Sequence, residues 1–305
     1  MIPFAVRRVG GLLVTLLLIA TVSFFLLRLA PGGPFDADRE VDAAVRAAQE
    51  ARYRLDRSLP AQYAGWLADL LRGDLGPSSC YPGLTVNEVL AAAIPPSFLL
   101  GGLALGIALV LGVLAGALAG RHPGGLADRA VSMFALLFIS IPSFVLGAAL
   151  LLLFSLHLRW FPAGLLEGAA SLVLPVLTLG LPMAAVIARL ARSGLAETMG
   201  EDWIRTARSK GISETRVVLV HGLRTALLPV VSFLGPAAAG VLTGSVVVER
   251  IFALPGLGTH FVNSALNRDY SLVMGTVLVY SALLVTLNFL SDLALAALDP
   301  RARTR

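Results

Sequence analysis

Apolar runs long enough to cross a bilayer recur along this sequence. A helix rises about 1.5 Å per residue, so about 20 apolar residues span the hydrocarbon core. Only 14% of the residues are charged, against about 25% in soluble domains, and 57% are hydrophobic. We therefore predict an all-α integral membrane protein with six transmembrane helices, near residues 9–30, 97–119, 126–156, 172–190, 225–248 and 271–298.

The first apolar run resembles a signal peptide in outline, because Arg7 and Arg8 precede it. The run is long enough to span, and cleavage after Ala30 would place Arg28 where the peptidase requires a small residue. We expect a retained span with its N-terminus in the cytoplasm. The chain then divides into the N-terminus and first span (1–30), an extracytoplasmic helical insert (31–96) and a core of five spans (97–305).

The insert carries nine acidic and six basic residues, as expected outside the cytoplasm. Pro60 suits a helix start and Gly73 a helix stop. An apolar stripe at helical spacing lies between them. It would either pack on the protein's own spans or the lipid interface, the interpretation we favour, or form part of a platform for a substrate-binding protein; its members are Tyr63, Trp66, Leu67, Leu70 and Leu71.

A polar, cationic loop at residues 193–224 separates the fourth and fifth spans. Residues 201–224 hold five basic and three acidic side chains, and a positive excess beside spans predicts the cytoplasmic side. We expect Asp202 to cap a helix that runs to Lys210, and Gly211 to end it in a left-handed conformation. Such a helix is typical of a docking element, although a basic loop can also simply obey the positive-inside rule.

The residue order in this loop resembles the cytoplasmic signature loop of ABC-importer permease subunits. The run 206–211, Thr-Ala-Arg-Ser-Lys-Gly, and the later Ala-Leu-Leu-Pro at 226–229 carry the resemblance. The family pattern begins Glu-Ala-Ala, and this chain has Arg205 and Thr206 in the first two places, a variant that resembles the peptide-importer branch. The resemblance implies a coupling helix that docks on an ATPase, formed by Glu201, Asp202, Trp203, Arg205, Thr206, Ala207, Lys210 and Gly211.

Other segments extend the resemblance over nearly the whole chain. They include residues 24–32, 56–63, 73–78, 81–89 and 267–271, the tail at 299–303, and an outer loop that contains Phe252, Pro255, Gly256 and Gly258. The chain is similar to the peptide/nickel family of ABC-importer permeases, in particular the B-type membrane subunit of oligopeptide importers. This implies type I ABC-importer permease architecture, with both termini cytoplasmic, in the bacterial inner membrane.

The resemblance also implies partners. These are a second homologous permease subunit, two ATP-binding subunits and an extracytoplasmic peptide-binding protein, with peptide as substrate. ATP and Mg would bind to the ATPase subunits, and we expect no cofactor, metal or nucleic acid on this chain. The sequence has no Gly-x-x-x-x-Gly-Lys-Ser/Thr phosphate loop and only 4 histidines, so we expect no enzyme activity. Alternatives are dipeptide or nickel-chelate cargo, or a gradient-driven secondary transporter, which would need ionisable residues in mid-membrane.

Small residues mark two of the spans. Gly112 and Gly116 are four residues apart and predict close contact between the second span and another helix. In the fifth span, small or mildly polar residues share one side of a helix. This side would serve tight packing, or form a wall of the translocation path, or both; its members are Ser232, Pro236, Gly240, Thr243, Gly244 and Ser245.

Overall fold

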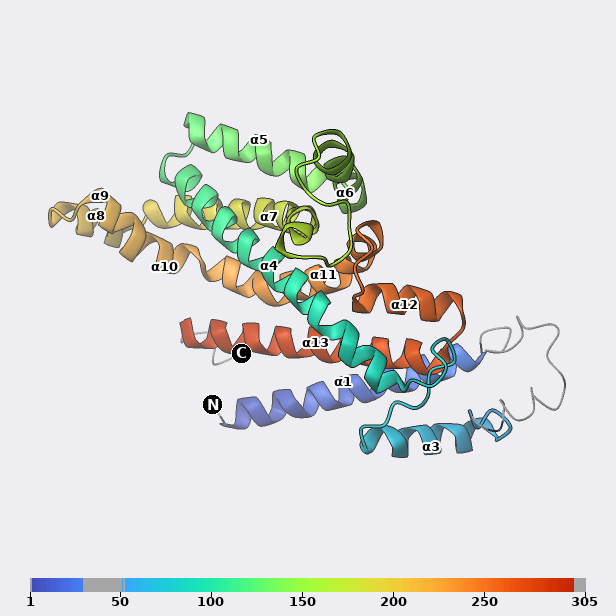
Figure 1. Cartoon of the computed structure of the whole chain (residues 1–305). Coiled ribbons are helices and arrows are strands. Elements are labelled where there is room, and N and C mark those ends of the chain that lie inside the picture. Colours follow the sequence, from blue (N-terminus) through green and yellow to red (C-terminus); the bar gives the residue numbers. More distant parts are fainter. Residues whose placement is uncertain (1, 30–50, 52, 299–305) are drawn as a thin grey trace. The chain divides into compact units, whose positions relative to one another are not determined.

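A computed structural model describes residues 2–29, 51 and 53–298 of the chain, without the side chains of residues 2–9, 242–244 and 296–298. The regular structure of these residues is helical, apart from one isolated antiparallel bridge between Pro77 and Thr85 (Figure 1). Four helices are long and apolar enough to cross a membrane, or up to six if each of two bent helix pairs counts as one span.

The chain divides into two compact units. The larger unit holds residues Ser97–Leu254 and the last helix from Leu283 onward. Its elements lying wholly in this unit are α5 (Leu126–Ser140), α6 (Ser143–Leu150), the π-helix η1 (Leu151–His157), the 3₁₀-helix η2 (Ala169–Leu172), α7 (Val173–Met199), α8 (Asp202–Ser209), α9 (Glu214–Arg216), the π-helix η3 (Val217–Gly222), α10 (Leu223–Ala226) and α11 (Leu228–Ile251).

The smaller unit comprises Ile2–Pro96 and Pro255–Ala282. It contains α1 (Ile2–Leu29), α3 (Leu59–Leu71) and α12 (Leu257–Leu266), while α4 (Val86–Arg121) and α13 (Tyr270–Leu298) contribute to both units. The helix α4 begins 11 residues before the expected start at residue 97 and runs through Pro95 and Pro96. The helix expected from residue 60 is confirmed as α3, and Gly73, just beyond it, has a φ of +77°.

Proline lies at the break in each of the two bent helix pairs. The chain bends by 100° between α5 and α6, where Pro142 precedes the first residue of α6. It bends by 52° between α10 and α11, where Pro229 is the second residue of α11. Proline lacks a backbone N–H and clashes with the preceding turn, which explains both breaks.

Glycines bring α4 into close contact with α7, as the spacing of Gly112 and Gly116 predicts. A Cβ atom built on Gly116 would lie only 2.6 Å from the Ala188 carbonyl oxygen and 2.6 Å from Ala191 Cβ. Gly120, four residues on, approaches the backbone of Arg192 in the same way. Such backbone contact is a main source of helix association in lipid.

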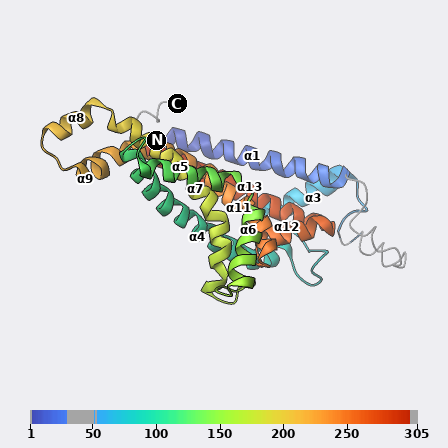
Figure 2. The ribbon, with the colours of Figure 1, turned by 90° about the horizontal axis from the view of Figure 1, so that it is seen from above.

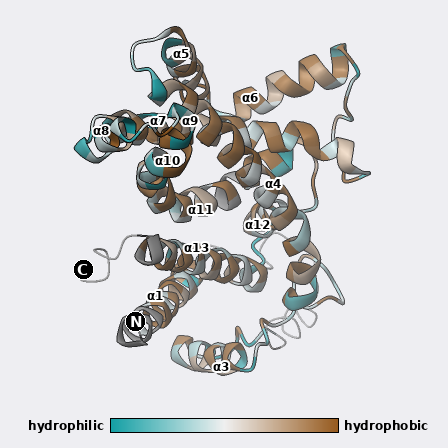
Figure 3. Ribbon diagram, turned by 90° about the vertical axis from the view of Figure 1, so that its left-hand side faces the viewer, coloured by the Kyte–Doolittle hydropathy of each residue, from teal (hydrophilic) through white to brown (hydrophobic). Residues whose placement is uncertain are grey.

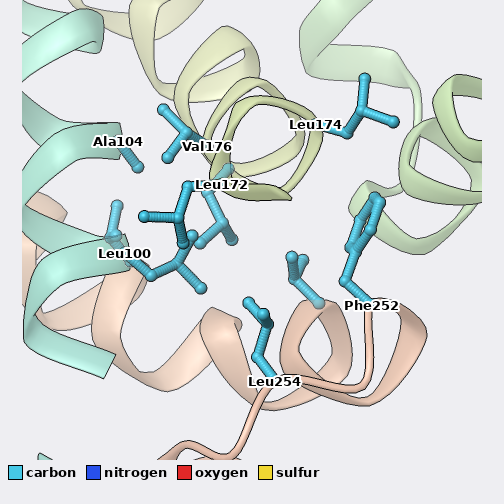
Figure 4. Close-up of a cluster of buried hydrophobic side chains, with 10 residues drawn as sticks. Leu100, Ala104, Leu172, Leu174, Val176, Phe252 and Leu254 are labelled. Atoms are coloured by element: carbon cyan, nitrogen blue, oxygen red, sulfur yellow. The ribbon is translucent and has the colours of Figure 1, made fainter. Parts of the chain in front are cut away.

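The core of the larger unit lies where α4, α7 and the end of α11 meet. Leu100 and Ala104 of α4 pack with Val176 of α7 and with Phe252 and Leu254, which follow α11 (Figure 4). All five side chains are less than 4% exposed. This contact fixes the outer loop after α11 by hydrophobic burial.

In the smaller unit, α3 packs on α1 through aromatic side chains. Tyr63 and Trp66 contact Phe24, with ring centroids 5.2 and 5.5 Å apart. The guanidinium of Arg28 lies 3.7 Å from the Phe24 ring centroid and donates to Gln62 Oε1 at 2.7 Å. Packing on a span of the same chain is therefore the role of this part of the stripe. Leu71, the last residue of the stripe, takes no part in this packing, because it is 82% exposed at the end of α3.

Candidate functional site

A helix is present at the position of the predicted coupling helix; it is α8, which projects with α9 beyond the end of α7 (Figure 2). Ile204 and Ala207 are buried against Val217 of η3, with Met199 and Ile212 packed around them. The other predicted coupling residues are exposed, and the Trp203 side chain is 41% exposed. One side of α8 therefore packs against the rest of the protein, and the remaining sides are exposed to solvent.

The two ends of α8 are built differently from each other. The N-cap residue is Glu201, without a side-chain capping bond, so the prediction that Asp202 is the cap is wrong. Asp202 is the first helical residue, where its carboxylate faces the positive end of the helix dipole and accepts from Arg205 Nη1 at 3.2 Å. At the other end Gly211 has a φ of +73° and donates its N–H to the Arg208 carbonyl at 2.9 Å, which confirms the predicted left-handed stop.

A two-pronged ion pair joins α8 to α9. Arg208 donates from Nη2 to Glu214 Oε1 at 2.8 Å and from Nε to Oε2 at 3.1 Å. The hydrogen bond to Glu214 raises the pKa of Arg208 above its usual value, which is already high, so this guanidinium stays charged. This ion pair holds the loop after Gly211 against α8 and links the two short helices rigidly to each other.

A second ion pair, buried on its acidic side, joins the first turn of α5 to the C-terminal half of α7. Arg192 donates to both carboxylate oxygens of Asp128, and Asp128 also accepts the Gly124 N–H at 2.8 Å. The Asp128 side chain is 5% exposed. In the sequence, the signal for such a pair is an acidic residue, Asp128, in the first turn of an apolar helix.

The predicted pathway residues of α11 separate into two groups. Ser232, Pro236 and Gly240 are exposed on one side of the helix, and a Cβ atom on Gly240 would meet nothing within 4 Å. Ser245 is fully buried and does not lie on that exposed side. The side chain of Thr243 and the surroundings of Gly244 lie outside the described residues.

The outer loop leaves the helix after Ile251, and helical structure resumes at Leu257. Phe252 is 1% exposed, and its carbonyl accepts the Leu165 N–H at 3.0 Å. Of the other predicted loop residues, Gly256 and Gly258 are buried and Pro255 is exposed. Residues 252–256 therefore form a short non-helical connection in which Phe252 and Leu254 are buried.

Two buried, hydrogen-bonded carboxylates were not predicted from the sequence. Glu249 of α11 accepts from Ser97 Oγ of α4 at 2.7 Å, and both residues are 1% exposed. Asp269 accepts from Ser78 Oγ at 2.5 Å and from the Cys80 N–H at 3.0 Å, and it also caps α13. Among the described residues no group of three or more His, Cys, Asp or Glu side chains is placed to hold a metal ion.

Comparison with known proteins gives consistent matches. Residues 108–304 match a family described as "Binding-protein-dependent transport system inner membrane component", and residues 1–83 match the model of its N-terminal part. The oligopeptide transport system permease protein OppB of Haemophilus influenzae is 43% identical over 99% of this chain and 100% of its own length. The dipeptide transport system permease protein DppB of Bacillus subtilis is 41% identical over 99% and 98%.

The fold also resembles a solved structure. A chain of the inward-facing MetNI methionine ABC transporter superposes with a TM-score of 0.58, covering 69% of this chain and 96% of that chain. The sequence identity is 22%, so this likeness concerns the fold alone.

Proposed function

Because the chain belongs to the family of inner-membrane components of binding-protein-dependent transport systems, we propose that it is the permease subunit of an ABC importer for oligopeptides. The single observation that carries the cargo class is the 43% identity to OppB over the full length of both chains. The chain is a multi-pass protein of the bacterial inner membrane.

In the proposed topology the chain crosses the membrane six times, with each bent pair forming one span. Both termini and α8 would lie in the cytoplasm, and residues 31–96 outside. The charges support this arrangement, because residues 201–224 carry five basic and three acidic side chains, whereas residues 31–96 carry six basic and nine acidic ones.

Coupling would occur through the exposed sides of α8. ATP and Mg would bind on two partner ATPase subunits, and closure of these subunits would move α8. The pair between Arg208 and Glu214 and the cluster around Ile204 make α8 move together with α9 and η3. Since α7 ends one short turn before α8, the motion would pass to α7 and alternate the access of the pathway.

The exposed side of α11 would form part of the translocation wall. Ser232, Pro236 and Gly240 offer a small, mildly polar surface that does not select one side chain. A second homologous permease would supply the other half of the pathway, and an extracytoplasmic binding protein would select the peptide.

Uptake by the complete assembly tests this proposal. The permease, reconstituted in vesicles with its second permease, ATPase subunits and binding protein, should accumulate a labelled pentapeptide only when ATP is present. An uncoupler of proton and sodium gradients should leave the uptake unchanged. Import that follows the gradient instead of ATP would refute the proposal. Dipeptide and nickel-chelate uptake, measured in parallel, decides the cargo, since DppB is nearly as similar as OppB.

A further inference from the structure

Two arginines near the inner end of α7 differ in their surroundings. The Arg192 guanidinium is occupied, because it donates to both carboxylate oxygens of Asp128. Arg189, one turn earlier, is exposed, and within the part of the chain that the structure describes it makes no hydrogen bond or ion pair. No partner for the Arg189 charge is therefore found among the residues that the structure describes.

Arg189 lies deeper in the span than its neighbour. Three residues separate it from Arg192, which corresponds to about 4.5 Å along the helix. Asp128, the partner of Arg192, stands in the first turn of α5, so this pair marks the level at which α5 enters its span. Charged side chains beyond that level are rare, generally face a bundle interior or a water-filled cavity, and mark substrate paths.

The other sides of α7 are covered by neighbouring helices. Gly112 and Gly116 of α4 contact one side, and the Ala226 carbonyl of α10 closes on Gly194 at another. Asp128 of α5 covers a third side through Arg192. The side left uncovered carries polar residues at four-residue spacing, namely Arg189, Ser193 and Glu197, all of them exposed.

The exposed side of α11 continues this surface. Val230 of α11 packs in one cluster with Ile187 and Ala191 of α7. The start of α11 therefore lies beside the part of α7 that carries Arg189. Figure 3, which looks along these helices, shows α5, α7 and α11 in a column with α4 on one side of it. At about 100° per residue, the side of α7 that carries Arg189 and the side of α11 that carries Ser232 both lie on the face of this column away from α4.

The chemistry of this face fits a carboxylate. A guanidinium binds a carboxylate with two parallel hydrogen bonds and is less strongly hydrated than an ammonium group. The small residues of α11 leave room for side chains of different size. Every unmodified peptide ends in one carboxylate, whatever its sequence, so one arginine on a permissive wall can bind cargo of varied sequence.

We propose that Arg189 binds the C-terminal carboxylate of the peptide during its passage. This inference rests on the proposed peptide import and adds the residue that recognises a chemical group common to all free peptides. Its consequence is a preference of the permease itself, separate from that of the binding protein, for peptides with a free C-terminus over C-terminal amides.

The test compares two pentapeptides of one sequence, a free acid and a C-terminal amide, in vesicles that contain the complete assembly. The variants are Arg189→Gln, Arg189→Lys and, as a matched control, Arg129→Gln, which removes an exposed arginine from the first turn of α5. Uptake by each variant is divided by wild-type uptake of the same peptide, which removes the preference of the binding protein.

We expect Arg189→Gln to lower uptake of the free acid at least about tenfold, because this is the cost of losing a charge-assisted hydrogen-bonded pair. Uptake of the amide, which has no terminal carboxylate, should fall less than about twofold. Arg189→Lys should lose less of the free-acid uptake, and Arg129→Gln should change neither peptide. An equal loss for both peptides would overturn the inference in favour of a contact with lipid headgroups or with the second permease, and unchanged uptake would overturn it outright. If the wild type imports neither peptide with ATP, the peptide-import proposal itself fails and this inference with it.

Discussion

Replacing Gly116 with alanine should push α4 and α7 apart. The added Cβ atom would lie 2.6 Å from both the Ala188 carbonyl oxygen and Ala191 Cβ, whereas ordinary contact begins at 3.4 Å. The helices must therefore separate locally by about 0.8 Å, and the two contacting atoms are backbone and Cβ, which cannot rotate away. Overpacking of this kind costs about 1–3 kcal/mol.

The assay is the thermal stability of the purified protein in detergent, followed as the loss of the monodisperse peak on size exclusion after heating. At about 2–4 °C per kcal/mol, Gly116→Ala should lower the midpoint by about 2–12 °C. The matched control is Gly106→Ala in the same helix, where the new Cβ would meet nothing within 4 Å. Its midpoint should stay the same or rise, since alanine favours helix over glycine.

A second substitution tests the mechanism of the loss. In the Gly116→Ala background, Ala191→Gly removes one of the two atoms at 2.6 Å and should restore part of the stability, while the contact with the Ala188 carbonyl remains. Equal midpoints for Gly116→Ala and Gly106→Ala, or no rescue by Ala191→Gly, would refute the close approach of α4 and α7 as the reason.

Three further predictions follow from the loops and ion pairs. Gly211→Val should abolish most uptake while the protein still inserts normally, and Gly211→Asn should reduce uptake much less. The φ of +73° strains residues with a Cβ atom by about 1–2 kcal/mol, and asparagine tolerates it better than valine, while nothing lies within 4 Å of the new Cβ. Equal losses of uptake for the two variants would show that backbone strain is not the cause. Burial, reinforced by Asp269, raises the pKa of the Cys80 thiol to about 11, so maleimide labelling should be slow at neutral pH and should accelerate as the thiolate forms toward that pH; a midpoint near that of a free thiol would contradict this environment. Asp128→Asn should lower the thermal midpoint by leaving the Arg192 charge without its partner, and adding Arg192→Gln should recover part of it; additive losses would argue against the pair.

Local chemistry in the sequence predicted much of this structure. Apolar runs coincide with the long helices, Pro142 lies at the break between α5 and α6, and Gly211 lies at the end of α8. Each of these follows from one residue or one short run, because backbone conformation and helical periodicity are local properties. The start of α4 was misplaced for the same reason, since Pro95 and Pro96 are usual helix boundaries but lie inside this helix.

Only the tertiary structure decided which distant polar groups meet. Asp128 with Arg192, Ser97 with Glu249, and Ser78 with Asp269 are separated by 64, 152 and 191 residues. Periodicity shows which side of a helix is apolar, but the rotation and level at which two helices pack depend on all their side chains together. The same limit applies to Arg189, whose position in the sequence marks the inner end of a span, while the packing of α4, α5 and α10 around α7 determines that its side chain is left exposed.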